Sequence, residues 1–387
     1  MTVKLGYKQS EVGVIPDDWD AVNLQTVCSM KSGESITSAN IDGFSKYPCF
    51  GGNGLRGYTK RFTHDGAFAL IGRQGALCGN VVRAQGRFFA SEHAVVVTAQ
   101  PGTDVAFLTY VLGRMRLNRF SESSAQPGLS VSKVLKLALA VPPNEAEQRS
   151  IATALTDVDD LLTSLDRLIA KKRAIKQGVM HDLLTGRKRL PGFSGEWPLK
   201  PLGELAELHR TTTLPATRPE TLFTHFSLPA YDAGIPLPVE SGHAIGSAKF
   251  MVPQDAILVS KLNPRIPRTW KPLSIPPHSV ASTEWLVLTP RTEITRDFLF
   301  VACQSPAFTA ALQNAITGTT GSHQRVNPST ALTLLIALPP RPEQATIAAV
   351  LADLDDEIDA LQARRDKTHA IKQAMMAELL TGRTRLI

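Results

Sequence analysis

The sequence predicts an α+β fold in which two mixed α/β domains alternate with two long helices, and the helices pair as an antiparallel coiled coil with pseudo-two-fold symmetry. Three observations predict it: a near-duplicated stretch, an apolar seam in each copy, and a change of charge along each copy. KKRAIKQGVMHDLLTGRKRL at 171–190 returns as KTHAIKQAMMAELLTGRTRL at 367–386, and segments 147–190 and 343–386 are identical at 22 of 44 positions. Two copies with one long period indicate duplication of a whole unit rather than a solenoid of short repeats.

Apolar residues recur in each copy at alternating spacings of four and three, which is typical of a coiled-coil seam. The seam residues expected to pair the helices are Ile151, Leu155, Val158, Leu162 and Leu165, and then Ile347, Leu351, Leu354, Ile358 and Leu361. Each pattern begins after a Pro-Pro pair and stops at Thr-Gly, where glycine suits the residue after a helix C-terminus. The two stretches therefore predict helices of about 40 residues, each about 60 Å long.

Charge changes sign along each predicted helix. Residues 147–166 and 343–362 are acidic, whereas residues 171–190 and 367–386 are basic. Acid would face acid in a parallel pair, but in an antiparallel pair each basic end lies against the acidic start of the other helix. We therefore expect an antiparallel pair; the alternative interpretation is that these charges only form solvated helix faces.

The domain organisation follows from these helices. We expect α/β domains at 1–143 and 191–340, and helical spacers at 144–190 and 341–387. Both domains open with Trp-x4-Leu, contain short strand-like runs such as FALIG and AILVS, and end on Pro-Pro. Turn formers such as GGNG separate these runs, as in mixed α/β domains.

Composition narrows the function classes. A formal net charge of +7 and a pI near 9.3 favour a polyanionic partner. The sequence has no apolar run long enough to span a membrane and no apolar secretory segment at its start, so we expect a cytoplasmic chain without a membrane partner. Its four cysteines are scattered without zinc-site spacing, which predicts reduced thiols and no metal site.

Catalytic motifs are incomplete. Phe50-Gly51-Gly52-Asn53-Gly54 fits the glycine loop of methyltransferases, but the partner motif of adenine methylation, Asn or Asp followed by Pro-Pro and an aromatic residue, does not occur. No G-x4-G-K-[ST] phosphate loop and no E-x-K or D-x-K nuclease pair occurs either. The sequence therefore predicts a chain that is not an enzyme by itself and has no catalytic residue or cofactor of its own.

In their order, several segments resemble the specificity subunits of type I restriction–modification systems. They are SEVGVIPDDW (10–19), YPCFGGNGLRGY (47–58), LIGRQGALCG (70–79), the PP-x3-EQ step before Ile151, and AIKQ…LLTGR in both copies. The resemblance implies two target-recognition domains that each read one half of a split double-stranded DNA sequence, on helices that set the spacing. It also implies two copies of a DNA-adenine methyltransferase (modification) subunit and further restriction/translocase subunits. S-adenosylmethionine, ATP and magnesium are expected on those partners.

The residues expected at DNA are polar side chains in turn-rich segments, with Arg and Lys for phosphates and Arg, Gln, Asn and Ser for base edges. In the first domain they are Asn53, Arg56, Tyr58, Lys60, Arg61, Arg73, Gln74, Ser91, His93, Gln126, Ser130 and Lys133. In the second they are Lys261, Asn263, Arg265, Arg268, Lys271, His323, Gln324, Arg325 and Asn327. The second domain has no GGNG segment, so the sequence leaves its alignment to the first domain open.

Two other functions compete with this prediction. A bivalent coiled-coil scaffold that binds proteins would explain the helices but not the basic, amide-rich loops. A methyltransferase fused to its own recognition domains would need the missing catalytic motif. Salt-dependent DNA binding separates the first alternative from a specificity subunit, because phosphate contacts make affinity fall steeply with salt.

Overall fold

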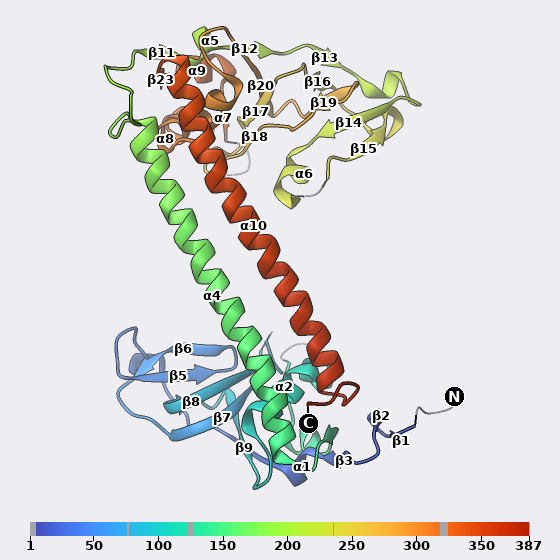
Figure 1. The fold of residues 1–387 in the computed structure, drawn as a ribbon. Helices are drawn as coiled ribbons and strands as arrows, with labels where there is room; N and C mark the ends of the chain where they lie inside the picture. Colours follow the sequence, from blue (N-terminus) through green and yellow to red (C-terminus); the bar gives the residue numbers. More distant parts are fainter. Residues whose placement is uncertain (1–4, 76, 123–126, 235, 318–323, 387) are drawn as a thin grey trace. The chain divides into compact units, whose positions relative to one another are not determined.

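The structure is a computed structural model that describes residues 5–75, 77–122, 127–234, 236–317 and 324–386. The chain forms two compact units: unit 1 contains Met1–Arg167 and Ala363–Ile387, and unit 2 contains Leu168–Gln362. Two long helices, α4 (Glu145–Leu184) and α10 (Arg341–Leu379), each contribute one part to unit 1 and the other part to unit 2 (Figure 1). Each unit therefore combines one α/β domain with a portion of both helices. In the described part of the chain, none of the helices combines the length and the apolarity that a membrane crossing requires.

Unit 1 is built on a six-stranded sheet of order β4-β9-β7-β8-β5-β6. Its neighbouring strands are antiparallel, except that β5 and β8 are parallel. The strands are β4 (Cys28–Ser32), β5 (Tyr47–Gly51), β6 (Gly54–Thr59), β7 (His64–Gly72), β8 (Val81–Ala90) and β9 (Ala94–Ala99). Shorter elements are the hairpin β1 (Tyr7–Ser10) and β2 (Gly13–Pro16), the pair β3 (Asp20–Asn23) and β10 (Ala138–Val141), α1 (Leu24–Val27), α2 (Val105–Arg114), α3 (Val131–Val134), η1 (Ser38–Asn40) and η2 (Leu117–Phe120).

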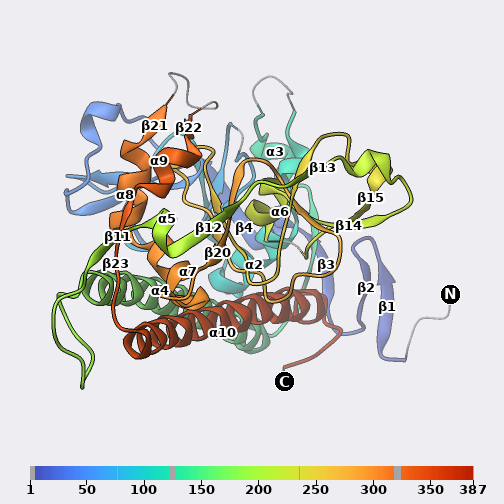
Figure 2. The same cartoon turned by 90° about the horizontal axis from the view of Figure 1, so that it is seen from above.

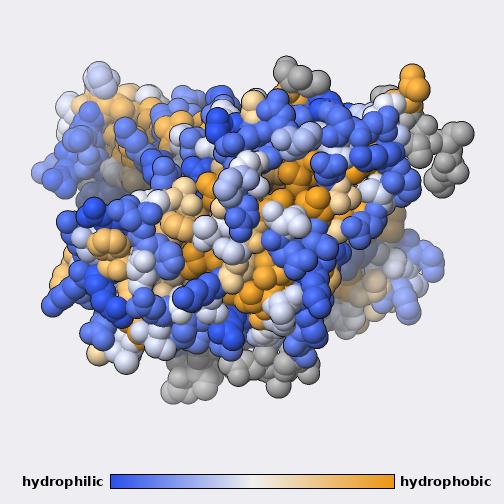
Figure 3. Space-filling model, turned by 90° about the horizontal axis from the view of Figure 1, so that it is seen from below, coloured by the Kyte–Doolittle hydropathy of each residue, from blue (hydrophilic) through white to orange (hydrophobic). Residues whose placement is uncertain are grey.

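Both faces of this sheet are covered at its centre. Ala69 and Ile71 of β7 join the larger core, whereas Leu70 between them joins a second cluster with Phe88. Successive strand residues point to opposite faces, so the continuous apolar run FALIG is what a strand buried on both sides needs. Helix α2 packs on the larger core, and its start is capped by the carboxylate of Asp104. Figure 3 shows the face of unit 1 seen from below, with apolar side chains at its centre and hydrophilic ones around them.

Unit 2 contains two sheets, of order β12-β20-β17-β18 and β13-β16-β19-β14-β15. The strands are β12 (Ala206–His209), β13 (Thr212–Thr213), β14 (Leu222–Phe226), β15 (Val239–Ser241), β16 (Lys249–Met251), β17 (Ile257–Ser260), β18 (Thr269–Trp270), β19 (Ser279–Ala281) and β20 (Trp285–Pro290). Two small pairs are β11 (Leu199–Pro201) with β23 (Leu335–Ala337), and β21 (Ile316–Thr317) with β22 (Arg325–Val326). The remaining helices are α5 (Leu202–Leu205), α6 (Leu228–Ala233), α7 (Arg296–Gln304), α8 (Pro306–Asn314), α9 (Pro328–Leu332), η3 (Pro215–Thr217) and η4 (Gly242–Ala244).

The two long helices lie side by side and antiparallel, as predicted (Figure 2). Ion pairs join the basic end of each helix to the acidic start of the other. In unit 1, Lys372 Nζ lies 2.5 Å from Asp159 Oδ1; in unit 2, Lys172 Nζ lies 2.6 Å from Glu357 Oε1, and Lys176 pairs with Asp355. The predicted complementarity of charge is therefore confirmed, and these charges are more than solvated faces.

The residues of the predicted apolar seam are buried or partly buried, and those at its ends also contribute to the domain cores. Its middle residues Leu165, Ile169 and Ile358 are buried, and Val158, Leu162, Leu354 and Leu361 are partly buried. At the ends, Ile151 and Leu155 also belong to the core of unit 1, and Ile347 and Leu351 to the core of unit 2. The first turns of each helix therefore hold a domain as well as the opposite helix.

The predicted glycine stops are also confirmed. Gly186 and Gly382 have φ values of 68° and 69°, and each N–H donates to a carbonyl of the last helical turn, at Leu183 and Leu379 respectively. A left-handed residue suits glycine because it has no Cβ.

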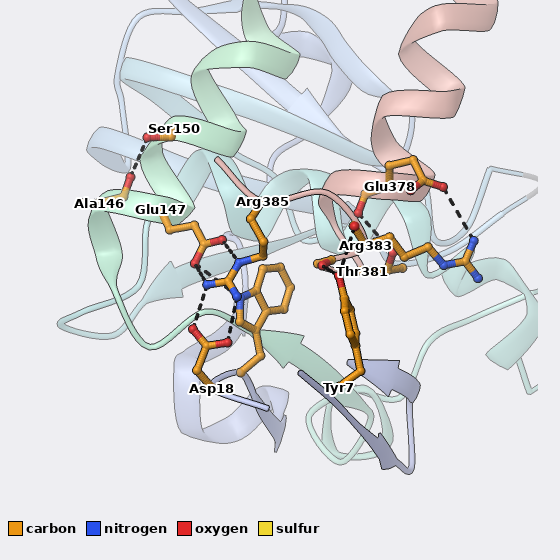
Figure 4. A network of polar contacts seen from close by, with 11 residues as sticks. Tyr7, Asp18, Ala146, Glu147, Ser150, Glu378, Thr381, Arg383 and Arg385 are labelled. Carbon is orange, nitrogen blue, oxygen red and sulfur yellow. Dashed lines mark hydrogen bonds and ion pairs between the residues drawn. The ribbon is translucent and has the colours of Figure 1, made fainter. Parts of the chain in front are cut away.

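The repeated Glu-Gln step begins both long helices and ties each of them to its domain. In unit 1, Arg385 donates from Nε and Nη2 to the nearly buried carboxylate of Glu147 at 2.5 and 2.8 Å, and also to Asp18 (Figure 4). The indole N–H of Trp19 donates to the same Glu147 carboxylate at 3.4 Å. The glutamine that follows, Gln148, donates to the carbonyls of Gly102 and Pro142.

Unit 2 repeats this arrangement with the other copy of the motif. Arg189 donates to the fully buried carboxylate of Glu343 at 2.7 and 2.6 Å, and Trp197 donates to it at 3.1 Å. Gln344 donates to the carbonyls of Glu293 and Pro339. The identity of the two copies at these positions therefore has a structural cause.

Candidate nucleic-acid interface

Several predicted DNA-contact residues converge on one pocket of the first domain. The pocket has a cavity volume of about 420 Å³ and is lined by Gly52, Asn53, Arg56, Gln74, Gly75, Leu77 and His93. These residues come from the β5–β6 hairpin, from the segment after β7 and from the turn between β8 and β9. The pocket thus unites four of the predicted residues, Asn53, Arg56, Gln74 and His93, from three segments of the chain.

Glycines allow these segments to approach so closely. A Cβ added at Gly72 would lie 2.1 Å from the carbonyl oxygen of Gly52, and one at Gly52 would lie 3.1 Å from that of Gln74. Gly75 has a φ of 88°, a conformation that favours glycine. The close backbone contacts that shape the pocket therefore explain the glycine-rich sequence, and a cofactor-binding loop is not needed to explain it.

The polar groups at the pocket are exposed and available. Among the described residues, the structure gives the side chains of Asn53, Arg56 and Gln74 no hydrogen-bond or ion-pair partner. His93 Nε2 lies 3.3 Å from Glu92 Oε1. Leu77 adds an apolar side chain that is 49% exposed. Two carboxamides, a guanidinium and an apolar group at one concave place are the chemistry that reads base edges.

The second domain repeats the backbone register of this pocket. Both domains place a basic residue directly after a buried strand, β7 or β17, and bond it to the turn before the antiparallel neighbour of that strand, β9 or β20. In the first domain the bonds are Arg73 N–H to His93 O at 2.9 Å, Gly75 N–H to Pro127 O at 3.0 Å and Leu129 N–H to Arg73 O at 3.0 Å. The matching bonds of the second domain, in the same order, are Lys261 N–H to Glu284 O at 3.0 Å, Asn263 N–H to Gln324 O at 2.8 Å and Val326 N–H to Lys261 O at 3.0 Å. This register settles the alignment that the sequence left open.

Different side chains occupy the matched positions. Glu284 stands where the first domain has His93, Arg325 where it has Gly128, and Leu262 where it has Gln74. Arg325 donates from Nε and Nη2 to the Glu284 carboxylate at 2.9 to 3.1 Å, and this bonding raises the pKa of the Arg325 guanidinium. The side chains of Arg325 and Glu284 are 42% and 23% exposed.

The glycine turn itself has no counterpart in the second domain. Ser91 N–H donates to Phe50 O in the first domain, and Ser282 N–H donates to Phe226 O in the second. After Phe226 the chain enters helix α6, whose start is capped by the Ser227 hydroxyl. Sequence reasoning missed Glu284 as a site residue, although the matched pairs Ala90-Ser91 and Ala281-Ser282 place it two residues beyond the second pair.

Other predicted residues of the first domain have partners within the protein. Arg61 pairs with Glu34 at 3.0 Å and lies over the Phe89 ring, and Lys133 pairs with Glu122 at 2.8 Å. Arg73 donates to the hydroxyl of Ser32 at 3.1 Å.

The serines and the remaining residues of this set differ in exposure. Ser130 exchanges a hydrogen bond with Ser132, while Ser91 is fully buried and its hydroxyl accepts from the His93 N–H. Burial corrects the prediction for Ser91: its hydroxyl supports the turn and cannot reach a base. Tyr58 is partly buried, Lys60 is exposed, and Gln126 lies outside the described residues.

In the second domain, ion pairs engage two of the predicted cations. Arg268 donates to both oxygens of Asp232 at 2.6 and 2.9 Å, which lowers the pKa of the Asp232 carboxyl and raises that of Arg268. Lys271 pairs with Asp297 at 2.8 Å.

The remaining predicted residues of this domain fall into three groups. The side chain of Asn327 caps α9 by accepting from Ser329 N–H at 3.0 Å. Lys261 and Arg265 have no side-chain partner among the described residues, and Asn263 has a φ of 47°. The amide oxygen of Gln324 is buried without a partner, and His323 lies outside the described residues.

A larger hollow lies elsewhere in unit 1. Its cavity volume is about 1320 Å³, and the hairpin β1–β2, α2, β10, α4 and α10 line it. Its cationic side chains are Arg83, Arg114, Arg116, Arg119 and Lys372. Burial lowers the pKa of Arg114, and the nearby charge of Arg383 lowers it further. Its acidic side chains are Glu11, Asp159 and Asp160, and Asp159 pairs with Lys372, so the hollow combines apolar groups with charges of both signs and more cations than carboxylates.

The cysteines and the acidic residues form no reactive cluster in the described part of the chain. The four cysteines are buried and unpaired, and burial raises the pKa of the Cys28 and Cys303 thiols to about 12. No group of three or more His, Cys, Asp or Glu side chains in the described ranges could hold a metal ion.

Comparisons with known protein sequences match parts of this chain. Residues 16–176 match the family described as Type I restriction modification DNA specificity domain. Over 165 residues, 42% of this chain, the sequence is 44% identical to the Type I restriction enzyme EcoprrI specificity subunit of Escherichia coli, and the match spans 40% of that protein. It is also 27% identical over 121 residues to a putative type I restriction enzyme specificity subunit of Haemophilus influenzae, spanning 30% of each chain. The matches therefore cover less than half the length of these relatives.

Solved structures match the fold over nearly the whole chain. The crystal structure of a type I restriction–modification S subunit from M. genitalium superposes with a TM-score of 0.67 at 17% identity, over 98% of both chains. A second structure, from work on complex assembly and conformational transition of the type I R-M system, has a TM-score of 0.55 at 16% identity and covers 95% of this chain and 99% of that one. These comparisons confirm the predicted resemblance and the fold class of two α/β domains with two long helices.

Proposed function

We propose that the chain is the sequence-reading subunit of a type I restriction–modification system, from the premise that residues 16–176 match the DNA specificity domain family of such systems. Each domain reads one half of a bipartite double-stranded DNA target. The helices set the gap between the halves and dock the modification subunits. The chain itself carries out no catalytic step and acts through its partners.

The observation that carries this proposal is the matched register of the two domains. One backbone framework presents Gln74 and His93 in the first domain, and Glu284 with Arg325 in the second. A common framework with different polar groups is what reading two different half-sites requires, because base identity is read through donors and acceptors at base edges.

Phosphate contacts supply the affinity that is common to all sequences. Lys60, Lys261 and Arg265 have no side-chain partner among the described residues and suit this role. Arg61, Lys133, Arg268 and Lys271, by contrast, have acidic partners, so a phosphate would have to compete with a carboxylate for them.

The partners follow from the same premise. We propose two DNA-adenine methyltransferase subunits and the restriction/translocase subunits, with S-adenosylmethionine, ATP and magnesium bound by those partners. The hollow of about 1320 Å³ in unit 1, with its apolar walls and Arg114, Arg116 and Arg119, suits an acidic amphipathic segment of one modification subunit. We propose that the complex is cytoplasmic.

The test is selection of DNA by the purified full chain from a pool of randomised duplexes at increasing salt. We expect enrichment of a bipartite sequence, with an affinity that falls steeply between about 50 and 200 mM salt as phosphate contacts are screened. Enrichment of no sequence, together with salt-independent capture of protein partners, would instead support a bivalent coiled-coil scaffold.

A further inference from the structure

We propose that the matched segments determine which base pair each domain reads: the Gln74 carboxamide in the first domain reads an A·T pair, and the Glu284 carboxylate, held by Arg325, reads the cytosine of a G·C pair in the second. This inference rests on the proposed function and deepens it, because it assigns base chemistry to particular residues. It has three parts: a common framework, the side chains of the first domain and the side chains of the second.

The two domains can be compared position by position because their backbones share one hydrogen-bond register. Arg73 and Lys261 both follow a buried strand, and each accepts and donates backbone hydrogen bonds at the same register. The next residue in each domain, Gln74 or Leu262, forms an isolated bridge to the facing segment, at Gly128 or Arg325. Side chains at these positions therefore leave the backbone from equivalent places.

In the first domain this place presents amides. Gln74 is exposed, and its carboxamide has no partner among the described residues; Asn53 across the same pocket is in the same state. A carboxamide offers a donor and an acceptor side by side, which match N7 and the N6 amino group of adenine. Gly128 on the facing segment adds no side chain, so the pocket stays open to a base edge.

In the second domain Leu262 stands at the position of Gln74, and an ion pair lies at the facing positions: Glu284 at that of His93 and Arg325 at that of Gly128. Arg325 holds both oxygens of Glu284, and this bonding fixes the plane of the guanidinium next to a carboxylate. Carboxylates accept from the N4 amino group of cytosine, so a Glu284 carboxylate held in this way suits the cytosine of a G·C pair. Leu262 in place of Gln74 removes the amide that would read adenine.

The experiment compares the bases that the full chain and its variants select from randomised duplex DNA. For Gln74→Ala we expect loss of preference at one A·T position of one half-site, by about 5- to 150-fold, with the other half-site and the gap unchanged. For Glu284→Gln we expect the corresponding loss at one G·C position of the other half-site. Lys60→Ala is the matched control, because a lost phosphate contact should weaken all sequences alike.

The outcomes separate this inference from the proposed function. If the unchanged chain selects no bipartite sequence, both fail. If it selects one but Gln74→Ala leaves every position unchanged, or relaxes a G·C position, the base assignment fails and the proposed function stands. Gln74 has no side-chain partner, so its removal should leave the melting temperature unchanged, and this keeps the test valid even if Glu284→Gln disturbs the fold.

Discussion

Arg385 provides the sharpest test of what joins the helices to the domains. We predict that Arg385→Met lowers the free energy of unfolding by about 3–5 kcal/mol, because it leaves the carboxylate of Glu147 buried without its cation. The side chain of Glu147 is only 5% exposed, and after the substitution its one remaining hydrogen-bond donor in the described structure is the indole of Trp19. The second partner of Arg385, Asp18, is 58% exposed, so Asp18→Asn should cost at most about 1 kcal/mol.

A double variant separates the effect of losing the ion pair from the effect of leaving a buried charge unpaired. Arg385→Met with Glu147→Gln removes the buried charge as well as its cation, so it should recover most of the loss. The assay is urea unfolding followed by circular dichroism, with Arg189→Met as the matched variant in unit 2, where Glu343 is fully buried. A loss below 1 kcal/mol for Arg385→Met, or a double variant no more stable than the single one, would refute the reasoning.

Three further predictions concern the core, the spacing and the thiols. Leu155→Asp, which places a carboxylate where both the domain core and the helix pair are apolar, should cost several kcal/mol and abolish co-purification with a modification subunit; unchanged melting would contradict the assignment of the seam. Four residues inserted near Lys176 should lengthen α4 by about 6 Å, close to two base-pair steps of about 3.4 Å, and should change the gap by one or two base pairs while both half-sites stay the same, as read by methylome sequencing. The raised pKa of the Cys28 and Cys303 thiols predicts no alkylation of these residues by iodoacetamide at pH 8 in the folded chain. It also predicts stability that falls as the pH rises above about 9, where the unfolded thiols ionise first; rapid alkylation of the native chain would contradict their burial.

Periodic and local features of the fold could be predicted from the sequence. The spacing of Leu165 and Ile358 predicted the helices, and the charges of Lys172 and Lys372 predicted that they run antiparallel. Both predictions were possible because the apolar period and the charge distribution are properties of one continuous segment of sequence. The share of Ile151 and Ile347 in the domain cores was not predicted, since a heptad pattern does not say which other surface an apolar residue meets.

The site was predicted only in part. Asn53 and Gln74 were both chosen as candidates and share a pocket in the structure, but their proximity depends on the close crossing of Gly52 and Gly72, which no local pattern shows. Arg268 was chosen on the same grounds, yet its partner Asp232 lies far along the chain and becomes a neighbour only through folding.

Glu284 was not among the candidate residues because an acidic side chain was not expected at DNA. Its place is clear only from the matched hydrogen bonds of the two domains. The contact roles of the other predicted residues stay predictions.

The most direct test of the central claim is a map of methylated adenines in the DNA of cells that express this chain with its modification subunit. Two different half-sites separated by a gap of fixed length are the predicted result, and Gln74→Ala should then relax one half-site only. A methylated sequence without a gap, or one that stays unchanged when the pocket residues of both domains are substituted, would contradict the account.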